Sequence, residues 1–113
     1  MKKRLRKKLH LKDYAEYGVD MELKILSNMG HEQFDRFIEG GFIEEFVEGN
    51  GLYCGGGWDP ETKSASLFIE TGRDLARAEN IAKKIKVWIE EKNIRYELKT
   101  AIHDAFYPDR ILK

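Results

Sequence analysis

Apolar and polar residues alternate without interruption from Val19 to Ile25, the pattern of a strand with one buried and one solvated face. After a short turn, phenylalanines recur at three- and four-residue steps from Phe34 to Phe46, which predicts an amphipathic helix with an aromatic stripe. Gly49-Asn50-Gly51 ends that helix. The chain up to this point therefore predicts one strand followed by one helix.

Two adjacent glycines, Gly40 and Gly41, lie inside the predicted helix. Each glycine in a helix interior costs about 1 kcal/mol relative to alanine, so the pair needs a structural reason. We expect either that the helix bends at the glycines or that a neighbouring strand approaches its backbone closely there.

The second half of the chain predicts two strands, a helix and a last strand. Residues 52–58 form a short strand that runs into three glycines, residues 59–63 form a turn, and residues 64–71 form an antiparallel partner strand. Thr71, three residues before Asp74, is a candidate helix cap. Apolar residues then trace one stripe from Leu75 to Ile89, and the helix ends near Asn93. Alternation over residues 95–102 predicts the fourth strand.

The resulting order, β-α-β-β-α-β, predicts an α+β protein of the ferredoxin-like split βαβ type, with an antiparallel four-stranded sheet and two helices on one face. We expect two parts, a basic N-terminal arm with a short joining segment over residues 1–17 and a single ferredoxin-like domain over residues 18–113. This fold hosts many functions, so function has to be argued from particular residues.

Charge is distributed very unevenly along the chain. The whole sequence has 20 basic and 20 acidic residues, but seven of the first twelve residues are Lys or Arg and none of those twelve is acidic. Residues 13–113 therefore carry 13 basic and 20 acidic residues, a net charge of −7. Clustered like charges resist burial, so the arm is expected to bind a polyanion, and the acidic body requires that contact to be made through the arm and the faces near it.

Composition narrows the class of protein further. A chain of 113 residues with 42% hydrophobic content suits one domain with a single core. Cys54 is the only cysteine, so no intrachain disulfide forms, and no apolar run is long enough to span a bilayer. The basic start is not followed by the apolar segment of a signal peptide. We expect a reducing, cytoplasmic location.

Little in the sequence indicates catalysis or a cofactor. His10, His31 and His103 lack the spacing of a metal site, and no base lies near Cys54 in the sequence to activate it. Gly55-Gly56-Gly57 follows a strand, but the Lys-Ser/Thr of a phosphate-binding loop is missing and no helix opens behind it, so a bulge or tight turn is the expected structure. We therefore predict a protein without catalytic residues, metal or cofactor.

Two nucleic-acid binding modes can be compared. RNA-recognition modules stack bases on aromatic residues of the sheet, but their signature is absent, and the best matching strand offers only Phe68 and a carboxylate. The lysines and arginines of the arm can bind phosphates with no sequence requirement. We favour polyanion binding by the arm over a solubilising tail or an anionic-membrane contact.

Several motifs resemble those of a known family. The segment Arg4-Leu5-Arg6-Lys7-Lys8-Leu9-His10, followed by Asp13-Tyr14, Glu16 and Gly18, resembles the opening of the YggL family of small bacterial proteins that bind the large (50S) ribosomal subunit. Tyr53-Cys54-Gly55-Gly56-Gly57 and Asp104-Ala105-Phe106-Tyr107 match later motifs. Leu9 replaces a methionine of the family pattern, and Phe106-Tyr107 stand where paired tryptophans can occur.

The resemblance implies a non-enzymatic protein that docks on the large subunit, in its assembly or in translation. The arm supplies the expected rRNA contacts, which are Lys2, Lys3, Arg4, Arg6, Lys7, Lys8, His10 and Lys12. A second contact could come from Tyr53, Gly55, Gly57 and Trp58. The alternative from another class is a small-molecule sensor or protein adaptor whose ligand edge is the loop from Tyr53 to Trp58. An enzyme built on Cys54 is a weaker option.

Overall fold

The structure, a computed structural model, describes residues 2–3 and 17–104. Nine elements follow one another along these residues: β1 (Lys2–Lys3), β2 (Tyr17–Ile25), α1 (His31–Asp35), the π-helix η2 (Arg36–Val47), the 3-10 helix η3 (Glu48–Asn50), β3 (Tyr53–Asp59), β4 (Ser64–Gly72), α2 (Leu75–Glu90) and β5 (Tyr96–Asp104).

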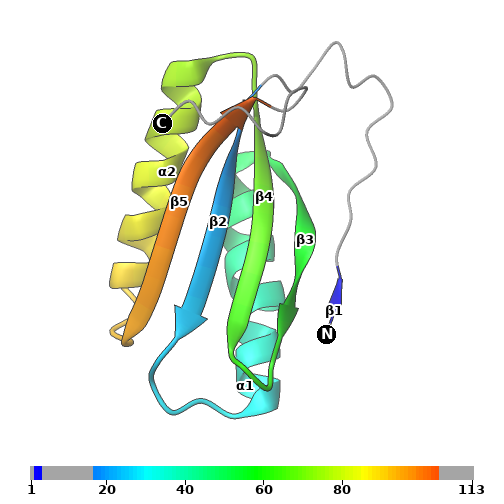
Figure 1. The fold of residues 1–113 in the computed structure, drawn as a ribbon, viewed down its shortest axis with the longest axis vertical. Helices are drawn as coiled ribbons and strands as arrows, with labels where there is room; N and C mark the ends of the chain where they lie inside the picture. Colours follow the sequence, from blue (N-terminus) through cyan, green and yellow to red (C-terminus); the bar gives the residue numbers. More distant parts are fainter. Residues whose placement is uncertain (1, 4–16, 105–113) are drawn as a thin grey trace.

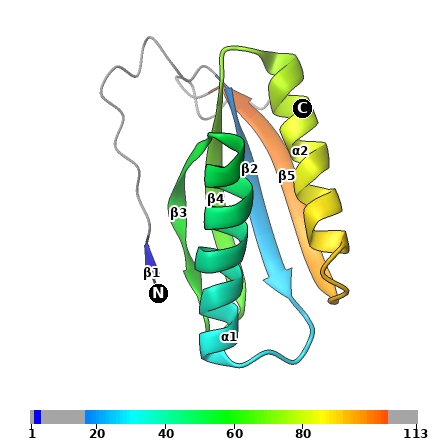
Figure 2. The same ribbon diagram turned by 180° about the vertical axis from the view of Figure 1, so that it is seen from behind.

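The strands form one antiparallel sheet in the order β1-β3-β4-β2-β5. Both helical segments cover the same face of the sheet and leave the other face open (Figures 1 and 2). The four strands from β2 to β5 have the ferredoxin-like arrangement, so the predicted fold class is confirmed. The two-residue strand β1, which adds to the edge beside β3, was not predicted from the sequence.

The alternation in β2 directs one side of the strand into the core. Val19, Met21, Leu23 and Ile25 are all buried, whereas Glu22 and Lys24 are exposed on the open face. β2 is an interior strand, paired with β4 on one side and β5 on the other. The strict period of two seen in the sequence thus reflects a strand that is buried on one face and solvated on the other.

The first helix has the predicted aromatic stripe but an unusual winding. Phe34 in α1 and Phe42 and Phe46 in η2 are buried. From Arg36 onward the helix is π-helical, and the Gly40-Gly41 pair lies within this stretch. The expected close approach of a strand at the glycines is wrong. A side chain of the other helix takes that place, since a methyl group on Gly41 would lie 3.4 Å from Cη2 of Trp88.

The three glycines are part of strand β3, where they lie in unbroken register with β4. The expected bulge or tight turn is therefore wrong. Gly56 has φ = 125°, and a Cβ atom there would come within 2.2 Å of the carbonyl oxygen of Ser66. The backbones of β3 and β4 approach so closely at this position that only glycine fits, which explains at least one of the three glycines.

Helix α2 follows its sequence pattern closely, and Ala78, Ile81, Ile85 and Ile89 are buried along one stripe. Its cap differs from the prediction. Asp74 is the N-cap, and its Oδ1 accepts a hydrogen bond from the amide of Ala76 at 2.9 Å. Thr71 is instead buried in β4, where its hydroxyl donates to the carbonyl oxygen of Tyr17.

Candidate nucleic-acid interface

The basic arm begins at an edge of the sheet. Lys2 pairs with Trp58 and Lys3 with Gly57, so the first two lysines of the arm lie along β3. The other predicted rRNA contacts, which are Arg4, Arg6, Lys7, Lys8, His10 and Lys12, lie outside the described residues. The origin of the arm is thus placed at the β3 edge, at the opposite side of the sheet from β5 and α2 (Figure 1).

The four residues of the predicted secondary contact differ in their exposure to solvent. Tyr53 is 52% exposed at the start of β3. Gly55 and Gly57 lie within the strand, where Gly55 pairs with Phe68 and Gly57 with Ser66. Trp58 is only 1% exposed, and its Nε1 donates a hydrogen bond to Oδ1 of Asp35 at 2.9 Å.

Trp58 is therefore a core residue that joins β3 to the first helix, and a ligand cannot reach it without local opening. The interpretation of residues 53–58 as a ligand-binding loop is also wrong, because these residues form a strand paired on both sides over part of its length. Of the predicted secondary contacts, Tyr53 keeps an accessible side chain.

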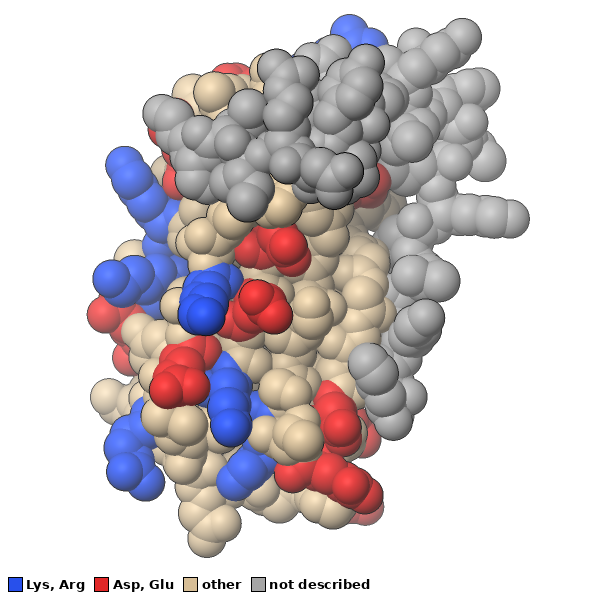
Figure 3. All heavy atoms as spheres, in the orientation of Figure 1, with Lys and Arg blue, Asp and Glu red and all other residues tan. Residues whose placement is uncertain are grey.

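A second group of cations, which the sequence reasoning missed, lies on and beside α2. Its members are all exposed, and no described carboxylate forms an ion pair with them: Arg73, Arg77, Lys83, Lys84, Lys86, Lys92 and Arg95. We call these seven residues the α2 cation surface. In the orientation of Figure 3, Lys and Arg side chains gather along the side of the molecule where α2 lies in Figure 1. The polar positions of the predicted helix already contain these cations, so the sequence pattern could have identified them.

The first helical region has the opposite charge. Residues 31–50 contain six acidic residues and one basic residue, Arg36, which forms an exposed ion pair with Glu32 at 4.0 Å. Glu44 and Glu45 are exposed on η2. A polyanion that approaches the helical face is therefore repelled by η2 and attracted by α2.

A groove of about 400 Å³ lies beside the α2 cation surface. Its floor is largely apolar, and it is lined by Phe46, Asn80, Lys83, Lys84, Val87, Trp88 and Glu91. The groove runs where η2 and α2 meet, and Trp88 packs there against Phe37, Phe42 and Phe46. Val87, which also lines the groove, is 53% exposed.

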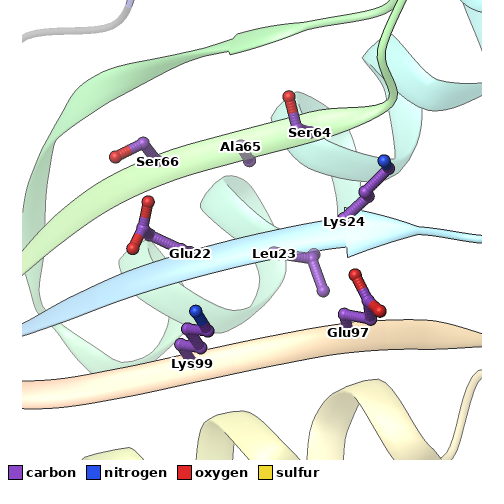
Figure 4. A pocket seen from close by; sticks show the side chains of 8 residues that line it. All are labelled: Glu22, Leu23, Lys24, Ser64, Ala65, Ser66, Glu97 and Lys99. Atoms are coloured by element: carbon purple, nitrogen blue, oxygen red, sulfur yellow. The ribbon is translucent and has the colours of Figure 1, made fainter.

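The open face of the sheet has a smaller hollow of about 250 Å³. Figure 4 shows acidic and basic side chains from β2 and β5 around it, with Ser64 and Ser66 of β4 at its other side. In register, Glu22 stands opposite Lys99 and Lys24 opposite Glu97, so neighbouring charges alternate in sign. Phe68 lies over Gly18, where a Cβ atom would be 2.2 Å from its Cζ. This mixed face is a poor surface for a polyanion.

Other candidate groups do not gather into a site. Cys54 is a buried free thiol in β3, and His31 is exposed on α1. His103 on β5 lies 3.8 Å from Asp20 on β2, measured from Nε2 to Oδ2. Within residues 17–104, no group of three or more His, Cys, Asp and Glu side chains is placed to hold a metal ion. None of the described helices has the length and apolar character needed to cross a bilayer.

Comparison with known proteins tests the resemblance stated above. The family model of the YggL 50S ribosome-binding proteins matches residues 3–107, which is nearly the whole chain. The chain belongs to this YggL family. The match includes the arm from Lys3 onward, both helical regions and all four predicted strands. No solved structure matches the chain.

Proposed function

We propose that this protein is a non-enzymatic factor that binds the large ribosomal subunit in the cytoplasm, with the lysines and arginines of its arm on rRNA phosphates. The observation that carries the proposal is membership of the YggL 50S ribosome-binding family over residues 3–107. The charge distribution supports the role of the arm, because its seven cations precede a body with a net charge of −7.

The position of the arm indicates how the protein is oriented relative to the rRNA. Its first two lysines lie along β3, at one edge of the sheet, while the acidic helix η2 covers the sheet beside β3 and β4 (Figure 2). RNA bound by the arm would be repelled by this acidic helical surface. We infer that the acidic surface faces solvent or a basic ribosomal protein, and that the protein acts during subunit assembly or in translation.

The test is sedimentation of the purified protein with separated 30S and 50S subunits. The full-length variant with Arg4, Arg6, Lys7 and Lys8 all replaced by alanine is expected to lose selective pelleting with 50S, while its thermal melt stays nearly unchanged. Retained 50S binding by this variant would refute the role of the arm. Equal pelleting of the wild type with both subunits would show a generic polycation.

Salt dependence gives a second readout. If the arm neutralises about four to six phosphates, the logarithm of the association constant should fall with the logarithm of the salt concentration with a slope of roughly −3 to −5. A slope near zero would contradict phosphate binding, since counterion release is the source of the salt effect.

A further inference from the structure

The groove between η2 and α2 combines features that neither the arm nor the family description explains. It has an apolar aromatic floor, two lysines on its rim and an amide beside them, from Trp88, Lys83, Lys84 and Asn80. All four residues belong to α2, where Asn80, Lys84 and Trp88 follow one another at four-residue steps and therefore share one side of the helix, and Lys83 directly precedes Lys84.

The charge around the groove indicates the class of its ligand. Lys83 and Lys84 are exposed, and neither forms an ion pair with a described carboxylate. Two further cations lie along the same segment of the chain. Arg77 precedes Lys83 by six residues, and Lys92 follows Trp88 by four residues. Glu91 is the single carboxylate in the lining. The rim is therefore suited to a phosphate-bearing chain.

The aromatic floor of the groove favours one kind of phosphate-bearing ligand. The indole of Trp88 is half-buried, and one of its faces is covered by the exposed side chain of Lys92, whose Nζ lies 4.2 Å from the ring centroid. Duplex RNA would offer only its backbone to this surface, whereas an unpaired base can enter an apolar groove and stack on an aromatic ring. Stacking would displace the Lys92 ammonium, which can then move to a phosphate.

The residues that pack around the indole of Trp88 hold it in place at the groove. Trp88 packs against Phe37 and Phe42, with ring centroids 5.5 and 5.4 Å away, and against the backbone of Gly41. The absence of a side chain at Gly41 lets the indole settle onto η2, next to the stacked pair Phe42 and Phe46. A half-buried ring held in this way provides a preformed stacking platform.

We propose that this groove binds an unpaired nucleotide of RNA, with the base against Trp88 and the adjoining phosphates on Lys83 and Lys84. The inference rests on the proposed function for its source of RNA, an exposed loop or bulge of rRNA. The site itself can be tested without ribosomes. It would give the protein a second contact on the helical face, separate from the β3 edge along which the arm begins, and the two together would select a single-stranded segment beside a duplex.

The test is titration of the full-length arm variant, with Arg4, Arg6, Lys7 and Lys8 replaced by alanine, with a ten-nucleotide single-stranded RNA. Tryptophan fluorescence and RNA anisotropy are measured together. Quenching of the accessible Trp88 is expected, because Trp58 is buried and serves as a nearly constant background. A duplex RNA of the same length should bind at least about five-fold more weakly, since it lacks an unstacked base.

The charge-reversal variant Lys83→Glu with Lys84→Glu, made in the same arm-variant background, should bind the single strand at least ten-fold more weakly. Its salt slope should be smaller in magnitude by about 1.4, which corresponds to two phosphates of a single strand. The matched control is Lys24→Glu with Lys99→Glu on the open sheet face, where both lysines are exposed and the charge change is the same. Equal loss in both variants would overturn the site, because only net charge would matter.

Two further outcomes would also overturn it. One is absence of quenching by the single strand at low salt, and the other is equal quenching by a poly-glutamate peptide, which would make the groove a protein-docking surface. Failure of the proposed function is separable from these outcomes. A protein that does not pellet with 50S can still bind the oligonucleotide, and a protein whose groove is inert can still pellet through its arm.

Discussion

The two helical regions pack against the same face of one sheet yet present opposite charges to solvent. The segment from α1 to η3 has six acidic residues and one basic residue, whereas residues 73–95 have the seven basic residues of the α2 cation surface and four acidic residues. Both regions bury a stripe of large apolar side chains in the core. The net charge of the protein does not reveal that the acidic and basic residues lie on two separate surfaces. A polyanion responds to each surface separately, because it is attracted by one and repelled by the other.

The largest expected effect comes from removing the side chain that joins the two regions. Trp88→Ala takes away the indole that packs on Gly41, Phe37 and Phe42, and should lower the free energy of unfolding by roughly 2–4 kcal/mol. The measurement is urea denaturation followed by circular dichroism.

Val87→Ala is the matched control, since its side chain is next along the helix but 53% exposed. It should change stability by less than about 0.5–1 kcal/mol. A similar loss in both variants would mean that Trp88 does not connect the helices.

The next effect concerns how the two helices begin. Asp74 caps α2 through its carboxylate, whereas the N-cap of α1 is Gly30, whose hydrogen side chain offers no such bond. Asp74→Ala should cost about 1 kcal/mol of stability, and Gly30→Ser should add only a few tenths, because glycine is itself a tolerated cap. Thermal melts of both variants test this. An unchanged melt for Asp74→Ala would show that the cap does not contribute.

The glycine pair provides a finer comparison within the first region. No atom outside the local helix lies within 4 Å of a methyl group placed on Gly40, while one on Gly41 would touch Trp88 at 3.4 Å. Gly40→Ala should therefore stabilise the protein by roughly 0.5–1 kcal/mol through chain entropy. Gly41→Ala should give less. If Gly41→Ala were the more stabilising of the two, the close packing of Trp88 on this helix would be contradicted.

The smallest effect on stability is expected from making the two surfaces alike in charge. Glu44→Lys with Glu45→Lys should change the free energy of unfolding by less than about 0.5 kcal/mol, because both side chains are exposed. The same variant should bind RNA of arbitrary sequence more tightly, by several-fold at low salt, since the repulsive surface has been removed. RNA anisotropy at two salt concentrations measures this. Unchanged binding would show that η2 does not exclude RNA.

Much of the fold followed from local pattern. The alternation over Val19–Ile25 and the stripe from Leu75 to Ile89 correspond to β2 and α2 within two residues at each end. These elements were predictable because their periodicity reflects burial on one side. The errors fell where long-range contacts decide the structure. One is at the glycines of β3, where the close approach of β4 requires glycine at position 56, and the other is at Thr71, which is buried in β4 instead of capping a helix.

For the candidate interface, sequence reasoning identified the family and the arm, because a dense run of cations is visible without a structure. It placed Trp58 at a surface, and the structure buries it against Asp35. It also missed the α2 cations, since their charges are interleaved with the apolar stripe and separate from it only on a formed helix. Whether the arm binds rRNA is a prediction that the sedimentation experiment tests.

By itself the sequence determined the order of strands and helices, the family and the uneven charge, because these properties depend on residues that are neighbours along the chain. Only the tertiary structure decided which aromatic side chains are accessible and which cations share a surface. The physical reason is that Trp58 and Asp35, or Trp88 and Gly41, are far apart in the chain and meet only when the helices settle on the sheet. The groove beside Trp88 exists only because of that packing.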